Sequence, residues 1–565
     1  MLISLRGYRR GWLRGDLIAG LTVWAVLVPE ALAYASIAGV SPVVGLYAAP
    51  GALLLYAVLG SSRQLVVGPM AATAALSAAA VGDLAAGRSR EFPALTVALA
   101  LTTGILALAA GAARLGFVAS LISEPVLKGF IVGLALTIIA GQVPALIGVP
   151  KGSGDFFEQA WDLLTRLGQV QWVTALVGLG SLATVAVLRR AAPAVPAPLV
   201  VVAAGTLAAY ALHLPGHGVA VVGHIGGGLP SFGLPGVPAA DYLRLAGPAA
   251  GICLIGFAEG LGAARACAGR GDRIRPNREL AGLGAANLAA GLSAGMVVNG
   301  SLSKTAVNGT AGARSQVSGL VVAGLTVLTL LLLTGLFTDL PEATLAAVVI
   351  AAVAELVDVG SLRALYRVHT SRLGRIYGPA ARADFIAALA ALAGVLLFET
   401  LPGLFIGITA AVLLLLLRAW RPNVAVLGEV PGGRGQWADV SRDPANRPVP
   451  GICVLRVESG LFFANADHVR TVIESSAGDG TAAVILDCET VPFVDVTAAR
   501  MLGDLAARLH GRGVRLVVAR EIGQVRDVLG TAGGPAAHLE RFATVRQAVG
   551  SVRAGLAAGD PTFRR

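Results

Sequence analysis

Charged side chains are scarce in this chain of 565 residues. Asp, Glu, Lys and Arg make up 14% of it, whereas 55% of the residues are hydrophobic and the mean hydropathy is +0.75. Such a composition excludes a single soluble domain. The apolar residues recur in runs of about 20, the length at which a helix crosses the hydrocarbon of a bilayer. The sequence therefore predicts a helical protein that crosses the membrane many times.

Cysteine is scarce as well. The four cysteines, Cys253, Cys267, Cys453 and Cys488, have the spacing of neither a zinc site nor a secreted disulfide framework. The sequence also lacks a nucleotide-binding loop and the motif of a catalytic triad. An enzymatic role therefore has little support, and we expect neither a metal nor another cofactor.

The formal net charge is +11, which could indicate a nucleic-acid partner. The basic residues, however, fall in short clusters between apolar runs, as the positive-inside rule of membrane proteins predicts. With the amino terminus inside, the clusters on cytoplasmic connections are Arg6 to Arg14, Arg114, Arg189 and Arg190, the segments 270–278 and 363–382, and Arg418 with Arg421. We expect a multi-pass protein of the bacterial inner membrane with both termini in the cytoplasm, and no nucleic-acid partner.

Fourteen membrane elements are expected from the apolar runs. Twelve are long, and two, near 68–82 and 301–313, are half-helices. The long ones lie near residues 16–38, 42–60, 93–113, 117–141, 170–190, 196–213, 246–268, 279–297, 316–337, 341–357, 382–399 and 402–420. Residues 1–421 then form the transmembrane part, with a first repeat at about 1–213 and a second at about 240–421.

The stretch from Val298 to Arg314, VNGSLSKTAVNGTAGAR, is rich in hydroxyl groups and glycine and carries a lysine between apolar runs. Irregular backbone at membrane depth is tolerated only where it lines a cavity or is buried in protein. The start of a helix offers unpaired N–H groups and a positive dipole end, so Ser301, Ser303 and Lys304 predict an anion-binding corner. The alternative is a polar loop outside the membrane.

The two halves of the chain repeat a pattern. VPEALAYASIAG from Val28 aligns with FAEGLGAARACAG from Phe257, which places Glu30 on Glu259, and Gly68 falls on Gly300 with nearly the same offset. Seven elements per repeat is an odd number, so the second copy is inverted in the membrane. Short interrupted helices at matching places of inverted halves indicate the midplane binding site of a transporter.

In the first half, Gly68 and Pro69 stand where a helix begins, since proline suits a first helical turn. The N–H groups of Met70, Ala71 and Ala72 would then face those of Leu302 and Ser303. Two positive helix ends opposed at the midplane make a site for a small anion.

Two carboxylates lie within membrane runs. Glu30 follows Pro29, and an ionisable residue at that depth indicates function because its charge is costly in the membrane. We interpret Glu30 as a proton carrier; the alternatives are a carboxylate bound to a neighbouring hydroxyl or paired with a buried cation. Glu259 is either an ion or proton site or part of a buried charge network, and Lys304 either faces the site or reaches the membrane interface and sets the topology.

After Arg421 the composition changes. A linker rich in Gly, Pro and Asp is expected over residues 422–450, followed by a small α/β domain over residues 451–565. Within it ICVLRVESGLFFANA predicts two strands, AAVILDC a buried strand, VDVTAARMLGDLAARLHGRG an amphipathic helix and VRLVVAR another strand.

Several of these segments together resemble the SulP family, the bacterial relatives of the SLC26 anion transporters. They include GLTVWAVLVPEALAYASIAGVSPVVGLYAA, SSRQLVVGP, SEPVLKGFIVGLAL, NRELAGLGAANLAAGLSAGMVVNGSLSKTAVN and RPNVAVLGEVPG. The resemblance implies an α-helical polytopic membrane protein with fourteen transmembrane elements in a seven-plus-seven inverted repeat, core and gate domains, a cytoplasmic α/β STAS domain and commonly a homodimer.

The resemblance also implies roles for particular residues. Substrate contacts are expected at Tyr34, Pro69, Met70, Ala71, Ser301, Leu302, Ser303, Lys304 and Thr305. Many relatives have arginine where this chain has Lys304, so only the charge of that contact carries over. In the STAS domain, Thr497 lies where a serine is phosphorylated in anti-sigma-factor antagonists, although a hydroxyl at a helix start more often caps the helix. A cytoplasmic partner could bind the STAS domain.

Together these observations predict a secondary active transporter of a small anion of the sulfate, bicarbonate or dicarboxylate class, coupled to protons through Glu30, with elevator-like movement. The alternatives are a sodium-coupled symporter, an anion exchanger, an uncoupled anion channel or a sensor with the STAS domain as its output. A nucleobase–proton symporter would share the fold but lacks a STAS tail.

Overall fold

The computed structural model describes residues 8–85, 88–152, 154–192, 195–223, 226–269, 272–367, 382–398, 400–433, 435–532 and 534–558. Arg6 and part of the basic segment 363–382 lie outside these residues. The chain divides into a helical unit, Met1–Val368 with Asp384–Ala411, and a tail unit, His369–Ala383 with Val412–Arg565.

Each expected membrane element corresponds to a helix. The first seven are α1 (Leu13–Ile37), α2 (Pro42–Leu59), α3 (Ala71–Leu84), α4 (Phe92–Ala112), α5 (Glu124–Ile147), α7 (Trp172–Ala191) and α8 (Ala197–Ala211). The second seven are α9 (Ala239–Ala266), α10 (Pro276–Leu292), α11 (Leu302–Thr310), α12 (Val317–Leu332), α13 (Glu342–Ala354), α16 (Ala383–Phe398) and α17 (Thr400–Trp420). Among the described residues, seven helices are long and apolar enough to cross a membrane and five apolar helices are shorter.

Several boundaries, among them both ends of α5, the start of α9 and the ends of α10 and α12, differ from the sequence prediction by five or more residues, and two of them have a local cause. Helix α5 starts at Glu124 instead of about 117, because Pro125 occupies its first turn and favours a helix start there. Helix α10 ends at Leu292 instead of about 297, where Ala294 adopts a positive φ of 51° and turns the chain. Two short helices, α6 (Phe156–Thr165) and α14 (Val359–Arg367), were not predicted.

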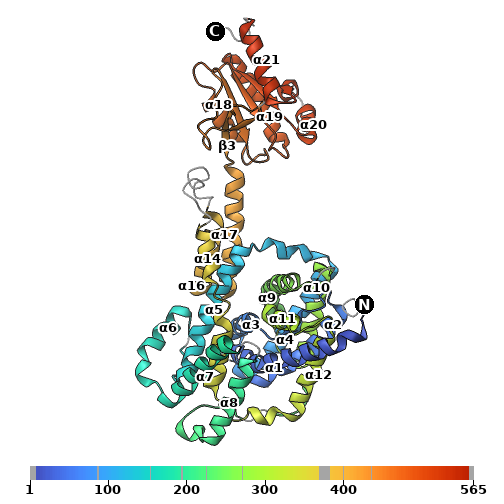
Figure 1. Cartoon of the computed structure of the whole chain (residues 1–565), viewed down its shortest axis with the longest axis vertical. Coiled ribbons are helices and arrows are strands. Elements are labelled where there is room, and N and C mark those ends of the chain that lie inside the picture. Colours follow the sequence, from blue (N-terminus) through green and yellow to red (C-terminus); the bar gives the residue numbers. More distant parts are fainter. Residues whose placement is uncertain are drawn as a thin grey trace. The chain divides into compact units, whose positions relative to one another are not determined.

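The helices of this unit form two bundles (Figure 1). In the first bundle α10 packs against α2 and α4, and α1 packs against α2 and α12. Glycines allow the closest approach: a Cβ on Gly284 of α10 would lie 2.7 Å from the backbone nitrogen of Leu108 on α4. In the second bundle α13 packs against α5 and α7. Helix α1 also contacts α8 and α13, so it lies where the bundles meet.

The tail unit contains a six-stranded sheet in the order β4-β3-β5-β6-β7-β8. The strands are β3 (Val424–Glu429), β4 (Trp437–Asp439), β5 (Ile452–Val457), β6 (Ala483–Asp487), β7 (Arg515–Ala519) and β8 (Glu540–Phe542). Strands β5 to β8 are parallel, and β3 pairs antiparallel with β5. One apolar core lies under α18 (Ala466–Ser476), α19 (Val496–Gly511) and α20 (Gly523–Thr531), and another under α21 (Val545–Ala557).

The sequence prediction for this region differs from the structure in two places. The segment 422–450, expected to be a linker, contains β3 and β4, which belong to the sheet because their alternating pattern places Ala425 and Leu427 in its core. The segment expected to form two strands forms one, β5, since the residues that follow turn into α18 at Ala466.

Candidate functional site

Two short strands bring the starts of the half-helices together. β1 (Val66–Gly68) pairs antiparallel with β2 (Asn299–Ser301), and α3 and α11 begin shortly after them. Val67 pairs with Gly300, so the two segments related by the sequence offset lie side by side. The ladder satisfies backbone N–H and C=O groups that would be costly if they were left unpaired at membrane depth.

Side chains fix the start of α11. The Ser301 hydroxyl accepts a hydrogen bond from the backbone N–H of Lys304 at 3.3 Å and caps the helix. The Thr305 hydroxyl accepts from the N–H of Val66 at 3.0 Å and donates to the carbonyl of Ser301. Thr305 is fully buried and joins the two segments.

The loop after α11 is held by a carboxylate of α1. Asp16 is fully buried and accepts hydrogen bonds of 2.7 and 3.1 Å from the N–H groups of Arg314 and Ser315, and one of 2.7 Å from the Ser315 hydroxyl. A buried carboxylate is tolerated when donors surround it in this way. Asp16 therefore attaches α1 to the far end of the second half-helix.

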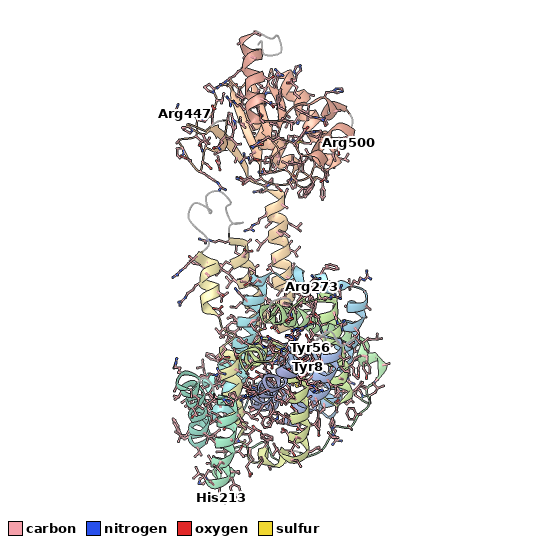
Figure 2. The ribbon with its side chains drawn as sticks, turned by 45° about the vertical axis from the view of Figure 1, so that its right-hand side comes forward. Tyr8, Tyr56, His213, Arg273, Arg447 and Arg500 are labelled. Atoms are coloured by element: carbon pink, nitrogen blue, oxygen red, sulfur yellow. The ribbon has the colours of Figure 1, made fainter. Side chains whose placement is uncertain are left out.

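A second buried carboxylate, Glu279 of α10, holds the loop before β1. It accepts from the Tyr56 hydroxyl and the Ser61 hydroxyl, both at 2.6 Å, and from the N–H groups of Ser61 and Ser62 at 2.6 and 3.0 Å. Tyr56 lies inside the helical unit, where Figure 2 labels it. Both half-helices are thus anchored to full-length helices of the first bundle.

Glu30 and Lys304 form an ion pair at the start of α11. Glu30 Oε2 lies 2.5 Å from Lys304 Nζ, and the two side chains are 8% and 2% exposed. Lys304 Nζ also lies 5.1 Å from the centre of the Tyr34 ring, on the same helix as Glu30, which is the range of a cation–π contact. The lysine is therefore inside the bundle and does not reach the interface.

A cavity of about 380 Å³ opens beside this pair and is called the central cavity below. On the first-bundle side it is lined by Thr22, Val26, Glu30, Tyr34, Met70, Ala71, Ala72, Glu259, Ser301, Ser303, Lys304 and Val307. On the other side its charged residues are Arg189, from α7, and Glu355, which follows α13. The cavity thus lies between the bundles and contains the starts of both half-helices.

The remaining charged residues of the cavity differ in their partners. Glu259 accepts a hydrogen bond of 3.2 Å from the side-chain amide of Asn299, a neutral group. Arg189 makes an ion pair of 2.6 Å with Glu355 and donates to the carbonyl of Ala351 at 2.8 Å. The carboxylate of Glu259 therefore faces the cavity with a neutral partner, whereas Glu30 and Glu355 face cations.

Residues 13–376 match the sulfate permease family, and residues 443–548 match the STAS domain. This chain belongs to the sulfate permease family. It is 38% identical over 533 residues to the probable sulfate transporter MT1781 of Mycobacterium tuberculosis, which covers 94% of this chain and 93% of that protein. High affinity sulfate transporter 1 of Stylosanthes hamata is 29% identical over 538 residues, covering 90% and 78%.

The fold agrees with that assignment. The structure of the murine Solute Carrier 26 family member A9 anion transporter in the inward-facing state superposes with a TM-score of 0.85 at 22% identity, covering 97% of this chain and 92% of that one. As a member of the sulfate permease family, the chain is a multi-pass membrane transporter of anions with a STAS domain, and it is not an enzyme.

The structure brings most of the expected site residues together. Tyr34, Met70, Ala71, Ser301, Ser303, Lys304, Glu30 and Glu259 all line the central cavity. Pro69, Leu302 and Thr305 do not: Thr305 and Pro69 are buried behind it, and the side chain of Leu302 is 53% exposed. Glu30 is paired with a buried cation, Lys304, which is one of the alternatives given for it, and its role as a proton carrier stays a prediction.

Sequence reasoning did not assign Arg189 and Glu355 to the site. The sequence places Arg189 only in a basic cluster that indicates topology, and nothing in it links Arg189 to a residue of another helix. In the tail, Thr497 is exposed in the first turn of α19, and the cap of that helix is Asp495, which accepts from the N–H of Ala498 at 2.7 Å. Phosphorylation of Thr497 stays a prediction.

Proposed function

We propose that this chain accumulates sulfate, or a closely similar small oxyanion, by symport with protons across the bacterial inner membrane. The names of its relatives support sulfate as the substrate. The observation that carries the coupling is the buried ion pair of Glu30 and Lys304 beside the central cavity.

The pair links proton binding to anion binding. While Glu30 is ionised, its carboxylate is paired with the ammonium of Lys304. An anion that entered this poorly solvated site would have to share that one cation with Glu30. Protonation of Glu30 removes this competitor and leaves Lys304 free to bind the anion. Proton and anion therefore bind best together, which is the requirement for symport.

The empty site has a complementary property. When the anion and the proton have left, Glu30 and Lys304 neutralise each other again. A neutral pair crosses the membrane at a lower cost than an isolated charge. The site can thus return empty, because the pair carries no net charge.

The movement we propose is an elevator-like shift of the first bundle against the second. The half-helices, the β1–β2 ladder, the anchoring carboxylates and the Glu30–Lys304 pair all belong to the first bundle. The opposite wall, with Arg189 and Glu355, belongs to the second. Because the site is tied together within one bundle, it can move as a rigid body.

The basic residues support an orientation with both termini in the cytoplasm. In this orientation α7 runs inward, so Arg189 near its end marks the cytoplasmic mouth of the central cavity. The same orientation places the end of α5 and the helix α6 on the outer side.

The test uses the full-length protein in proteoliposomes with labelled sulfate, bicarbonate, fumarate and nitrate, under imposed pH and sodium gradients. A pH gradient, acidic outside, should drive sulfate accumulation together with proton entry. Glu30→Gln should abolish both while it permits downhill anion exchange. Glu124→Gln, a change of the same chemistry at an exposed side chain of α5, serves as the control. Proton-coupled accumulation that is unchanged in Glu30→Gln would overturn the proposal.

A further inference from the structure

A second cavity of about 310 Å³ lies between α3 on one side and α5, α6 and α16 on the other. All of these elements belong to the helical unit. Its lining includes small residues of α3 and polar residues of the facing elements, among them Ala79, Gly82, Thr137, Gln142, Lys151 and Gln159. Sequence reasoning assigned no role to any of these residues.

The two cavities share helix α3 as a wall. Ala71 and Ala72, at its start, line the central cavity, and Ala79 and Gly82 line the second. A helix rises 1.5 Å per residue, so Ala72 and Ala79 lie about 10 Å apart along its axis. A shift of α3 along its own axis by this distance would bring the start of the half-helix to the second cavity.

Lys151 is the cation of this lining. It is exposed, and among the described residues it makes no ion pair. Its Nζ lies 3.9 Å from the position that a Cβ on Gly141 would occupy, so the ammonium lies against the bare backbone of α5. Gln159 Oε1 lies 3.5 Å from the same position, so the ammonium and this amide oxygen both lie close to the bare backbone of Gly141.

Among the described residues of the lining, Asp155 is the acidic one, and its carboxylate accepts a hydrogen bond. Asp155 Oδ1 accepts from the N–H of Glu158 at 2.9 Å as the cap of α6. The amides nearby are ordered: Gln159 donates to the carbonyl of Gly154 at 2.7 Å, and this fixes its side chain at the cavity. An anion would therefore find an unpaired ammonium and neutral polar groups, beside one carboxylate, that of Asp155, which already accepts a hydrogen bond at the start of α6.

We propose that the second cavity is the outer vestibule of the transport path and that Lys151 receives the small oxyanion there. This inference rests on the proposed function, since it takes the anion and the orientation of the chain from it. The anion would pass from Lys151 to the half-helix starts when the first bundle is shifted outward.

The first test compares Lys151→Gln with Lys151→Arg in right-side-out and inside-out membrane vesicles that contain the full-length protein. Lys151→Gln should raise the KM for sulfate supplied at the outer face by about threefold or more at low ionic strength, with little effect near 0.5 M salt, because screening shortens the reach of a surface charge. The KM measured from the cytoplasmic face should not change, and Lys151→Arg should behave as the unaltered protein.

Arg166→Gln provides the matched control. Arg166 lies just after α6 and pairs with Asp162, so its loss changes the charge of the same surface without touching the second cavity. An equal rise of the outer KM in Arg166→Gln would assign the effect to the general surface potential and would overturn the role of Lys151.

The second test obstructs the vestibule without removing a charge. A Cβ on Gly82 would have no heavy atom within 4 Å, so Gly82→Leu places a side chain in the open space of the cavity. It should lower the transport rate from both faces at least tenfold. Gly180→Leu on α7, where a Cβ also meets nothing within 4 Å, controls for a leucine in place of a helical glycine.

The outcomes separate this inference from the proposed function. Suppose that the unaltered protein transports sulfate, that Lys151→Gln leaves the outer KM unchanged and that Gly82→Leu leaves the rate unchanged. The assignment of the second cavity as the outer vestibule is then wrong, and the symport proposal stands. If the unaltered protein moves no anion, the proposed function fails first.

Discussion

Glu30 on α1 and Lys304 at the start of α11 lie 2.5 Å apart, nearly inaccessible to solvent, between the two halves of the chain. Such a pair contributes little net stability when it is intact, because desolvation of two charges offsets their attraction. A substitution that removes one of the two charges leaves the other charge buried without a partner. The same property that makes the pair a coupling device therefore makes it sensitive to single substitutions.

The first prediction concerns that sensitivity. Lys304→Met should destabilise the helical unit by about 3–5 kcal/mol, since it leaves the Glu30 carboxylate buried without a partner. Combining it with Glu30→Gln should recover most of the loss, because no buried charge remains. Thermal unfolding of the purified protein in detergent, at neutral pH, measures both. A double variant no more stable than the single one would show that the pair is not coupled.

The second prediction concerns the mouth of the central cavity. Glu355→Gln removes the carboxylate that faces Arg189 and leaves a net positive charge on the cavity wall. We expect the KM for sulfate at the cytoplasmic face to fall about two- to fivefold at low ionic strength, because an unneutralised cation attracts the anion more strongly. Arg189→Gln should raise it. Sulfate uptake into inside-out vesicles, whose external surface is the cytoplasmic face, gives both values, and changes of the same sign in the two variants would contradict the prediction.

The third prediction concerns the anchor of the first half-helix. Tyr56→Phe removes one of the four hydrogen bonds accepted by the buried carboxylate of Glu279. The loss should cost about 1–3 kcal/mol of stability, as expected when a buried charged acceptor loses a donor. Tyr47→Phe on the same helix is the control, because its hydroxyl is not part of this cluster. Equal unfolding temperatures for the two variants would show that Glu279 does not depend on Tyr56.

Much of the helical unit could be predicted from the sequence, because length and apolarity define membrane helices directly. The half-helices could be predicted too, since Gly68 and Gly300 occur at nearly the same offset as Glu30 and Glu259. Helix α6 was missed because it is too short to cross a membrane, although Asp155 and Glu158 form a capping box that marks its start.

The pairings inside the site could not be predicted. Glu30 bonds to Lys304 and Arg189 to Glu355 across different helices, and no local pattern specifies which faces of distant helices meet. Thr305 shows the same limit of sequence reasoning, for a residue that was expected to contact the substrate. Its hydroxyl looks like a substrate contact in the sequence, but it serves to join α11 to β1.

The fourth prediction uses the six-stranded sheet of the tail unit and the helices packed on it, which follow the last membrane helix, α17, in the chain. Burial, together with the carboxylates of Asp487 and Glu521, raises the pKa of the Cys488 thiol well above its usual range. Below about pH 8.5 the thiol is neutral in both the folded and the unfolded state. Above that pH only the unfolded state ionises, so the stability that Cys488 contributes is lost as pH rises.

The tail of the unaltered protein should therefore lose about 1.4 kcal/mol per pH unit above pH 8.5 that Cys488→Ala does not lose. The free energy of unfolding can be measured by pulse proteolysis of the full-length protein in urea between pH 7 and 10. Parallel pH profiles for the two proteins would refute the assignment, whatever their difference in stability at neutral pH.

The fifth prediction compares two acidic residues, Asp487 at the end of β6 and Glu489 two positions later. Asp487 is fully buried at the end of β6 and accepts from Arg456 at 2.8 Å and from Arg520 at 2.5 and 2.9 Å. Glu489 contacts the same two arginines at 3.5 and 2.8 Å, but its side chain is 52% exposed. Both residues neutralise the same cations, and they differ mainly in burial.

Asp487→Ala should destabilise the tail by about 1.5–3 kcal/mol, because it removes a fully buried carboxylate that accepts charge-assisted hydrogen bonds from Arg456 and Arg520. Glu489→Gln should cost less than about 1 kcal/mol, since an exposed ion pair is screened by water. Urea-dependent pulse proteolysis at pH 7 compares the two directly. If Glu489→Gln were as damaging as Asp487→Ala, the arginines would depend on the exposed carboxylate, and burial would not be what makes Asp487 the organising residue of this cluster.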